Sequence, residues 1–411
     1  MSAYDRYFLM KESDVADYVT AKMPDFFKLP LKLSVKEIGD GNLNYVFRVV
    51  NEADGRSLIV KQAGLTLRIS AAMKVSTDRN RIESEILLLQ DKYAGGLVPK
   101  LYRYDTVMCV CVMEDLSNYR LMRYALMEHK TFPHFAEDIT GYMVNTLLNT
   151  TDAVMEHKAK KDLVKRFINP ELCEITEDLV YTEPYKDNKK RNIVTPENLD
   201  FVKKELYGDR FLHLEVAKLK FEFMNNAQAL LHGDLHTGSI FVKDDEAGPG
   251  AATRVFDPEF AFYGPIGYDV GNIIANLFFA WHNGDGAGQT AFCDWVLTTA
   301  VSVIDLFKQK FLDGFTKNVT DVMAKTEGFA EYYLASIVSD TAACTGLELV
   351  RRTVGMAQVK DITTIADRER RVKAERINIL CAKDCILNRA SFTCGQDFVD
   401  ALKRAVNYVG K

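Results

Sequence analysis

The sequence predicts a two-lobed α+β fold, in which a small β-rich lobe precedes a larger, mainly helical lobe. The chain has 411 residues, which is more than a single hydrophobic core usually serves. Short β-rich runs and Gly-rich turns fill the early part of the chain, whereas helical periodicity dominates beyond residue 120. We therefore expect a β-rich lobe over residues 1–116 and a helical lobe over residues 117–411.

The N-terminal lobe is expected to begin with a short helix and to continue with strands joined by tight turns. The expected strands are residues 35–38, 45–50, 57–61 and 106–113. A Gly-rich turn, Gly39-Asp-Gly-Asn-Leu-Asn44, joins the first two of them. Ile82, Ile86 and Leu89 recur at helical spacing, so a helix is predicted over residues 78–93.

The larger lobe is predicted to be helical except for one β-hairpin. Residues 240–243 and 253–257 have strand-like composition and flank a turn-rich segment at 244–250. The chain is 47% hydrophobic and 27% charged, values that are typical of a folded globular protein. Its net charge of −5 argues against a nucleic-acid partner held by a general basic field.

The cysteines and the apolar segments bear on the compartment. Eight cysteines are scattered along the chain, which favours reduced thiols over a disulfide framework. Cys109 and Cys111 are expected to share one strand face, and no second pair completes a zinc site. No secretory signal is visible, and the apolar segment from Val270 to Trp281 is too short to span a bilayer. We therefore expect a cytoplasmic protein without a membrane partner.

The segment His232-Gly-Asp-Leu-His-Thr-Gly-Ser239 contains one carboxylate directly before a buried strand. Phosphoryl transfer from ATP requires a carboxylate aligned with the acceptor hydroxyl, and Asp234 is predicted to accept that proton. His232 and His236 would share one face of a helix and could bind a metal, but two glycines break a helix here. A structural His232, bonded to nearby backbone, is therefore preferred.

The triphosphate of ATP needs a cradle and a cation. The turn that ends at Asn44 lets backbone N–H groups approach phosphates, although taken alone it is more simply a hairpin turn. Lys61 leaves a buried strand beside this turn, where its ammonium can meet phosphate oxygens. Glu83, on the following helix, is the predicted partner of Lys61, and Glu85 is a near competitor.

Asp257 and Glu259 are predicted to bind Mg²⁺. They lie two residues apart in a segment expected to be extended and stiffened by Pro258, which would place both carboxylates on one face. Apolar neighbours on both sides indicate a buried environment, where carboxylates need partners. The alternative is a pair of ordinary surface carboxylates.

Further motifs run along most of the chain. They are Asp40-Gly-Asn-Leu-Asn44, Ile59-Val-Lys-Gln62, Met113-Glu-Asp-Leu-Ser117, Phe167-Ile-Asn-Pro170, Cys173-Glu-Ile-Thr-Glu-Asp-Leu179, the loop from His232, Asp257-Pro-Glu-Phe260, Gly264-Pro-Ile-Gly267 and Leu349-Val-Arg-Arg352. Together they resemble the protein-kinase-like small-molecule phosphotransferases and, among these, the 5-methylthioribose kinases of methionine salvage. The resemblance implies a protein-kinase-like fold and ATP-dependent phosphorylation of 5-methylthioribose at its anomeric hydroxyl. The products would be 5-methylthioribose 1-phosphate and ADP.

The resemblance also implies roles for single residues, together with Mg²⁺ as cofactor and a homodimeric assembly. The implied ATP-binding residues are Asn44, Lys61, Glu114, Asp115, Leu116, Asp257, Pro258 and Glu259, with Glu114 to Leu116 as the adenine-contacting hinge. Asp234 is implied at the sugar. Arg351 and Arg352 are implied at the substrate and the transferring phosphoryl group, where a fixed guanidinium stabilises developing charge. Because adjacent helical residues face different ways, the two arginines are expected to have different tasks.

One residue and one segment depart from the pattern of the family that the chain resembles. Ser239 stands where the related choline and aminoglycoside kinases usually place a metal-binding Asn, which leaves the metal to Asp257 and Glu259. Residues 65–75, expected to lie beside the nucleotide, lack the Ser-Trp-Pro run associated with the family.

Two other functions stay open from the sequence. The first is a phosphotransferase of the same fold that acts on choline or an aminosugar; a site with Arg351 and Arg352 suits an uncharged sugar better than a cation. The second is an inactive nucleotide-binding scaffold, which would have no need to keep Lys61, Asp234 and the Asp257–Glu259 pair together.

Overall fold

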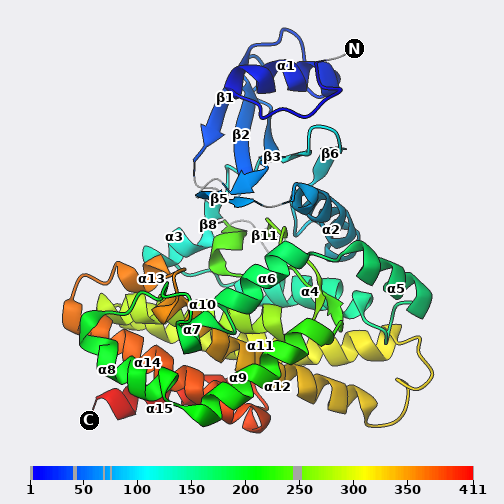
Figure 1. The fold of residues 1–411 in the computed structure, drawn as a ribbon. Helices are drawn as coiled ribbons and strands as arrows, with labels where there is room; N and C mark the ends of the chain where they lie inside the picture. The colour runs from blue at the N-terminus through cyan, green and yellow to red at the C-terminus, as the bar shows by residue number, and fades with distance from the viewer. Residues whose placement is uncertain (1–2, 40–43, 68–69, 75, 244–251, 411) are drawn as a thin grey trace. The chain divides into compact units, whose positions relative to one another are not determined.

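The structure is a computed structural model, and the chain divides into two compact units (Figure 1). The described residues are 3–39, 44–67, 70–74, 76–243 and 252–410. Unit 1 is Met1–Tyr119 with Arg254–Phe260, and unit 2 is Arg120–Thr253 with Ala261–Lys411. A small antiparallel sheet in unit 1 and a mainly helical unit 2 confirm the predicted α+β class. The sequence placed Asp257 and Glu259 in the larger lobe, whereas both belong to unit 1.

Unit 1 is built on a five-stranded sheet with the order β1-β2-β3-β7-β6. Its elements are α1 (Glu12–Lys22), β1 (Leu33–Ile38), β2 (Asn44–Asn51), β3 (Ser57–Ala63), β4 (Thr66–Leu67), β5 (Ser70–Lys74), α2 (Asp78–Ala94), β6 (Leu101–Asp105) and β7 (Val110–Glu114). Helix α1 packs against β1 and β2, and α2 packs against β3, β6 and β7. Lys61 therefore lies on the central strand, paired with Val46 on β2 and Cys111 on β7.

The predicted strand over residues 106–113 is wrong in its first half. The Asp105 carboxylate accepts hydrogen bonds of 3.0 Å from the N–H groups of Val107 and Met108, which closes a turn after β6. Cys109 follows with a φ of 50°, and β7 begins at Val110. Cys109 and Cys111 thus do not share a strand face. The continuous apolar run conceals this turn, because it contains no Gly or Pro.

The segment predicted as a divergent nucleotide-bordering loop contains a second, two-stranded sheet. Strands β4 and β5 pair antiparallel, with a register shift at Thr66/Leu67. The Gly-rich turn before Asn44 falls at residues 40–43, which lie outside the described residues.

Unit 2 is mainly helical. Its elements are β8 (Arg120–Leu121), α3 (Met122–Met127), α4 (Phe135–Leu147), η1 (Leu148–Thr150), α5 (His157–Arg166), α6 (Pro170–Leu179), α7 (Glu183–Lys186), η2 (Pro196–Asn198), α8 (Leu199–Val202), η3 (Lys203–Tyr207), α9 (Arg210–Asn225), β9 (Ala229–Leu230), η4 (Thr237–Ser239), β10 (Ile240–Val242), β12 (Tyr263–Gly264), α10 (Gly267–Gly286), α11 (Thr290–Asn318), α12 (Phe329–Val354), α13 (Lys360–Thr363), α14 (Arg368–Leu387), η6 (Arg389–Ser391) and α15 (Gly395–Val409). Strand β11 (Thr253–Val255) carries the chain back into unit 1. Strands β10 and β11 correspond to the two predicted hairpin strands.

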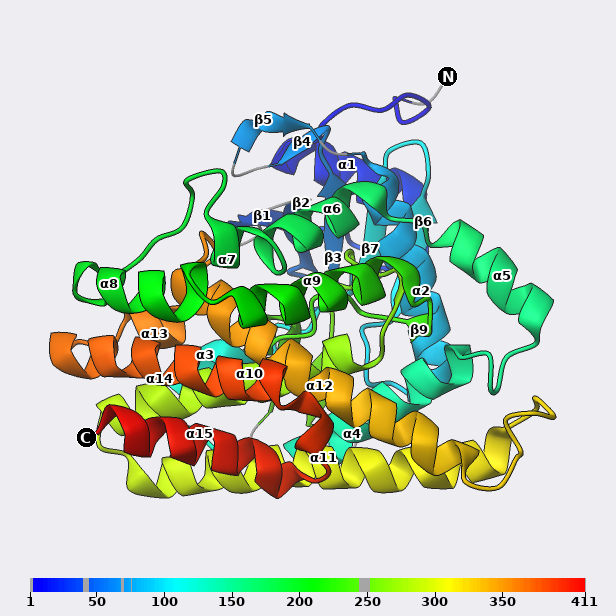
Figure 2. The same ribbon diagram turned by 60° about the horizontal axis from the view of Figure 1, so that its bottom comes forward.

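Close helix packing fixes the position of α12, which carries the arginine pair. Figure 2 shows α10, α12 and α14 side by side. A Cβ at Gly271 of α10 would lie 2.7 Å from the Cβ of Cys344 on α12. A Cβ at Gly346 of α12 would lie 2.5 Å from the Ala382 carbonyl on α14. Glycine at both positions therefore lets three helices approach more closely than any side chain would allow.

Helix α11 is long and apolar enough to cross a membrane by length and composition alone. It packs against α4, α10 and α15 within unit 2, and core helices of soluble proteins have the same length and composition. None of the eight cysteines forms a disulfide.

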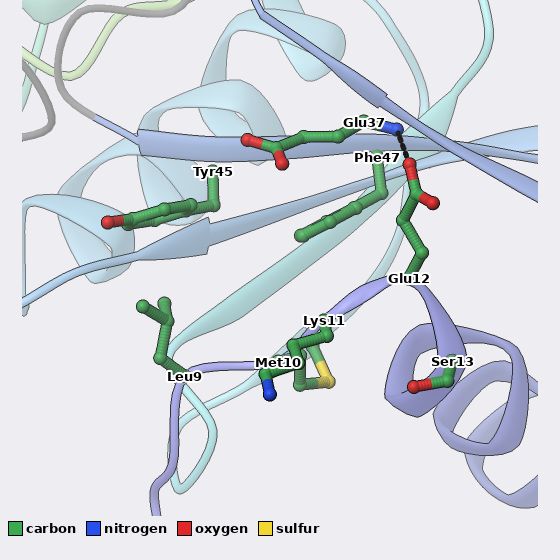
Figure 3. Close-up of a pocket in the computed structure, with 8 residues that line it drawn as sticks. All are labelled: Leu9, Met10, Lys11, Glu12, Ser13, Glu37, Tyr45 and Phe47. Carbon is green, nitrogen blue, oxygen red and sulfur yellow. Dashed lines mark hydrogen bonds between the residues drawn. The ribbon is translucent and has the colours of Figure 1, made fainter.

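A surface cavity of about 570 Å³ opens in unit 1 (Figure 3). Leu9, Met10, Lys11, Glu12, Ser13, Glu37, Tyr45 and Phe47 line it. The Glu37 N–H donates a 2.8 Å hydrogen bond to Glu12 Oε1, which ties β1 to the start of α1. None of these residues was predicted as a site residue, and the cavity has no part in the proposed chemistry.

Candidate active site

Unit 1 brings Lys61 together with three carboxylates. Lys61 Nζ donates a 2.7 Å hydrogen bond to Glu83 Oε1 and a second hydrogen bond to Asp257 Oδ1. The predicted Lys61–Glu83 pair is present, and the side chains of both residues are buried. Glu85, the alternative partner predicted for Lys61, instead accepts a hydrogen bond from Arg81 on the same helix. Burial lowers the pKa of Lys61, but Asp257, Glu83 and Glu259 outweigh this and hold it well above its usual value.

Asn44 links the end of the Gly-rich turn to Glu259. Its Nδ2 donates a 2.8 Å hydrogen bond to Glu259 Oε2, and its Oδ1 accepts a 3.1 Å hydrogen bond from Arg79 Nε. Arg79 is buried, lies 3.8 Å from Glu259 and also donates to the Gly64 carbonyl. Arg79 was missed in the sequence, because nothing in its spacing separates it from the many surface arginines of such helices.

Asp257 departs from the extended conformation that the sequence predicts. Its φ is 65°, a left-handed value that is rare for a non-glycine residue. This backbone turns the Asp257 carboxylate to Lys61, whereas the Glu259 carboxylate bonds to Asn44. The two carboxylates are not equally buried either, since the side chain of Asp257 is 38% exposed and that of Glu259 is 5% exposed. Backbone strain of this kind is concentrated at functional sites.

The charges of this cluster fit a cation. Three carboxylates, Glu83, Asp257 and Glu259, face two cationic side chains, Lys61 and Arg79. Burial and then the charge of Asp257 raise the pKa of Glu259 to about 8, against the attraction of Lys61. A divalent cation would offset this repulsion, and carboxylate oxygens are the ligands that Mg²⁺ prefers. Among the described residues no group of three or more His, Cys, Asp and Glu side chains is placed to hold a metal ion.

The predicted hinge begins at Glu114, the last residue of β7. Glu114 Oε2 accepts from the Lys100 N–H at 3.1 Å, and Asp115 Oδ2 accepts from Arg48 Nε at 2.6 Å. The Leu116 side chain is buried. The acidic side chains of the hinge thus hold the segment in place within unit 1.

Unit 2 holds the loop that carries Asp234, and its backbone is tightly anchored. Asp269, near the start of α10, accepts hydrogen bonds from the N–H groups of His232 (2.7 Å) and Gly233 (3.0 Å). Gly233 has a φ of 83°, which favours glycine at this position. His232 is buried, and its Nδ1 accepts from the Asp234 N–H at 3.3 Å, so the predicted structural role of His232 is confirmed.

Ser239, which replaces the expected Asn, has a structural contact of its own. Its Oγ donates a 3.0 Å hydrogen bond to the carbonyl of Asp234. Ser239 therefore stabilises the loop that positions the carboxylate.

His236, which the sequence suggested only as a possible metal ligand with His232, is a neighbour of Asp234. Its Nδ1 accepts from the Gly238 N–H at 2.9 Å, so the ring is neutral with its proton on Nε2, which lies 3.3 Å from Asp234 Oδ2. Burial lowers the pKa of His236; the charge of Asp234 opposes this shift and Arg123 adds to it. Burial raises the pKa of Asp234, but His236, Arg351 and Arg352 outweigh this and hold it well below its usual value. Asp234 is therefore ionised at neutral pH.

The arginine pair converges on one carboxylate, although adjacent helical residues were expected to face different ways. Arg351 Nη1 and Arg352 Nη2 each lie 3.6 Å from Asp234 Oδ1. Glu348 holds both, at 3.1 Å from Arg351 Nη1 and 2.7 Å from Arg352 Nε. Glu348 lies one helical turn before both arginines, so its carboxylate can pair with each of them. The long arginine side chains then bring the two guanidinium groups together. The spacing of Glu348, three and four residues before the pair, is the sequence signal that predicts this arrangement.

The family model for the phosphotransferase enzyme family matches residues 34–293. A methylthioribose kinase of Geobacillus sp. (strain WCH70) is 39% identical over 363 residues, which are 88% of this chain and 88% of the relative. A methylthioribose kinase of Geobacillus thermodenitrificans (strain NG80-2) is 39% identical over 368 residues, 89% of this chain and 90% of the relative. The solved structure of choline kinase from Cryptosporidium parvum Iowa II has a TM-score of 0.51 at 10% identity and covers 97% of each chain. That last likeness concerns the fold alone.

Proposed function

Because the chain belongs to the phosphotransferase enzyme family and, within it, to the methylthioribose kinases, we propose that it phosphorylates 5-methylthioribose with ATP at the anomeric hydroxyl. The products are 5-methylthioribose 1-phosphate and ADP, a step of methionine salvage. One structural observation carries this proposal: Asp234 lies in a rigid loop, ionised, beside two buried arginines. These are a proton acceptor and the cationic groups that phosphoryl transfer requires.

In the proposed reaction, Asp234 orients the anomeric hydroxyl and accepts its proton while the oxygen bonds to the γ-phosphorus and the bond to ADP breaks. Proton transfer comes late in a loose transition state, so a carboxylate of low pKa is sufficient. Arg351 and Arg352 stabilise the charge that develops on the phosphoryl oxygens. Glu348 keeps both guanidinium groups in place.

We assign the groups of unit 1 to ATP. Lys61, oriented by Glu83, binds phosphate oxygens, and Asn44 and the Glu114-to-Leu116 hinge bind the nucleotide. Asp257 and Glu259, joined by Pro258, would hold Mg²⁺, which neutralises the triphosphate when it is bound. The excess of carboxylates around Lys61 supports this assignment.

The alternative functions are not favoured. Curated relatives that are 35–39% identical over about nine-tenths of the chain are named methylthioribose kinases, not choline or aminosugar kinases. An inactive scaffold would have no use for a buried lysine–glutamate pair together with an ionised aspartate.

A substrate panel tests the proposal. With ATP and Mg²⁺, we expect ADP release with methylthioribose and little with choline, an aminoglycoside or ribose, because only methylthioribose matches both the sugar site and the family. Omission of Mg²⁺ is expected to abolish release. Equal ADP release with all acceptors would contradict the assignment of methylthioribose as the substrate. No ADP release with any acceptor would favour an inactive nucleotide-binding scaffold.

The pH dependence of kcat/KM tests the arginine pair. Removing one positive charge raises the pKa of Asp234, so Arg351→Gln is expected to move the acid limb of kcat/KM to higher pH, in addition to lowering the maximal rate. The titration of ATP is common to both enzymes and cancels in the comparison. Arg368→Gln, at an exposed ion pair with Glu197, is the matched control. An unmoved acid limb in Arg351→Gln would contradict the electrostatic role.

We further propose that the enzyme works in the cytoplasm as a homodimer. The eight free cysteines support a reducing compartment, and the family resemblance supports the dimer. Light scattering on the purified protein measures the assembly directly.

A further inference from the structure

Asp361, on the short helix α13, is a buried acid that the proposed function leaves without a task. Its side chain is 1% exposed, and neither carboxylate oxygen has a hydrogen-bond partner within the described part of the chain. Arg123 Nε lies 3.7 Å from Asp361 Oδ2, which is beyond hydrogen-bond distance. Burial raises the pKa of Asp361 despite the opposing charge of Arg123. A buried carboxylate in this condition requires an explanation.

Arg123, on α3, connects Asp361 to the catalytic loop. Arg123 Nη2 donates to Asn276 Oδ1 at 3.3 Å, and the same oxygen accepts from Thr237 Oγ1 at 3.2 Å. Arg123 Nη1 lies 3.1 Å from the position that a Cβ on Gly238 would occupy. The Arg123 guanidinium therefore extends from Asp361 to the loop that carries Asp234.

Both Asp361 and Arg123 have buried polar atoms without a hydrogen-bond partner among the described residues. Arg123 Nε has no hydrogen-bond partner among the described residues, and neither has Arg351 Nε. Arg123 and Arg352 both lie near enough to Asp361 to interact with it electrostatically. The charge of Asp234 also shifts the pKa of Arg123. Arg123 Nε is a donor and the Asp361 carboxylate an acceptor, and neither has a hydrogen-bond partner in the part of the chain that the structure describes. A ligand group that both donates and accepts a hydrogen bond would satisfy the two together. A hydroxyl is such a group.

We propose that Asp361 and Arg123 form a subsite for the ring hydroxyls of the pentose, an inference that rests on the proposed function. Asp361 accepts a hydrogen bond from a ring hydroxyl, and Arg123 donates one to a ring hydroxyl oxygen. Asp234 then holds the anomeric hydroxyl while this pair holds the other side of the ring. Choline has no ring hydroxyls, so the subsite also selects the acceptor.

The test compares Asp361→Asn with wild type on three substrates: methylthioribose, its 2-deoxy analogue and its 3-deoxy analogue. Losing one hydrogen bond to a buried charge costs about 10- to 100-fold in kcat/KM. We expect this loss for wild type on at least one analogue and for Asp361→Asn on methylthioribose. On the analogue that lacks the bound hydroxyl, Asp361→Asn is expected to lose no more than about threefold, because the interaction is already absent.

Equal losses on all three substrates, or no loss on methylthioribose, would overturn the subsite. Arg123→Lys, which keeps the charge but loses the planar fork, provides a second test with the same expected pattern if Asp361→Asn does not fold. If the wild-type enzyme releases no ADP with methylthioribose, the proposed function itself fails and the subsite fails with it.

Lys360→Met is the matched control. Lys360 Nζ donates a 3.0 Å hydrogen bond to the hydroxyl of Tyr124, so this exposed lysine joins α13 to α3 beside the Asp361–Arg123 pair. The variant disturbs the same helix contact without touching the subsite, and kcat/KM is expected to stay within about twofold on all three substrates. A substrate-selective loss in this control would mean that helix position, and not Asp361, determines the preference.

Discussion

Asp234→Asn is expected to lower kcat by about 10²- to 10⁴-fold, the contribution of a positioned general base. The amide keeps the size of the side chain but can neither accept the proton nor attract Arg351 and Arg352, each 3.6 Å away. Because the residues assigned to ATP do not include Asp234, ATP affinity is expected to change little. Steady-state ADP release and calorimetric titration with ATP measure the two effects separately.

Asp162→Asn is a matched control for this substitution. Asp162 is an exposed residue of α5, and the same chemical change there should leave kcat unaltered. If Asp234→Asn retained more than about a tenth of the wild-type kcat, the proton-accepting role of Asp234 would be wrong.

Lys61→Met is expected to reduce both catalysis and stability. Losing a cation at the phosphates should lower kcat/KM by about 10²- to 10³-fold. The same change leaves Glu83, whose side chain is 1% exposed, without its ion-pair partner, which should lower the free energy of unfolding by about 3 kcal/mol. Kinetics and urea unfolding measure the two effects.

The double variant Lys61→Met/Glu83→Gln separates them. Neutralising Glu83 removes the buried unpaired charge, so much of the lost stability should return while the activity stays low. Lys36→Met, at an exposed position on β1 of the same sheet, is the control and should change neither quantity. Recovery of activity in the double variant would contradict the role of Lys61 at the phosphates.

Local pattern was enough to predict most of unit 1. The strands around Phe47 and Val60 alternate or run apolar between turn residues, and the helix over 78–93 is present as α2. The failure at residues 106–109 has a local cause as well, because the side chain of Asp105 closes that turn where no Gly or Pro marks it. The left-handed Asp257 could not be predicted, since nothing in an Asp-Pro pair favours a positive φ.

The sequence by itself determined the chemistry of this protein: a lone acid in a glycine-containing loop, a strand lysine with a helical glutamate, and an arginine pair, all within motifs that identify the family. Tertiary structure decided which groups meet. Asp269 holds the loop, Glu348 gathers two arginines that adjacent helical positions would separate, and Asp361 faces Arg123 from another helix. The reason is physical. Residue type and spacing fix what a side chain can do, but the pKa and the partners of a buried charge depend on groups brought together from distant parts of the chain.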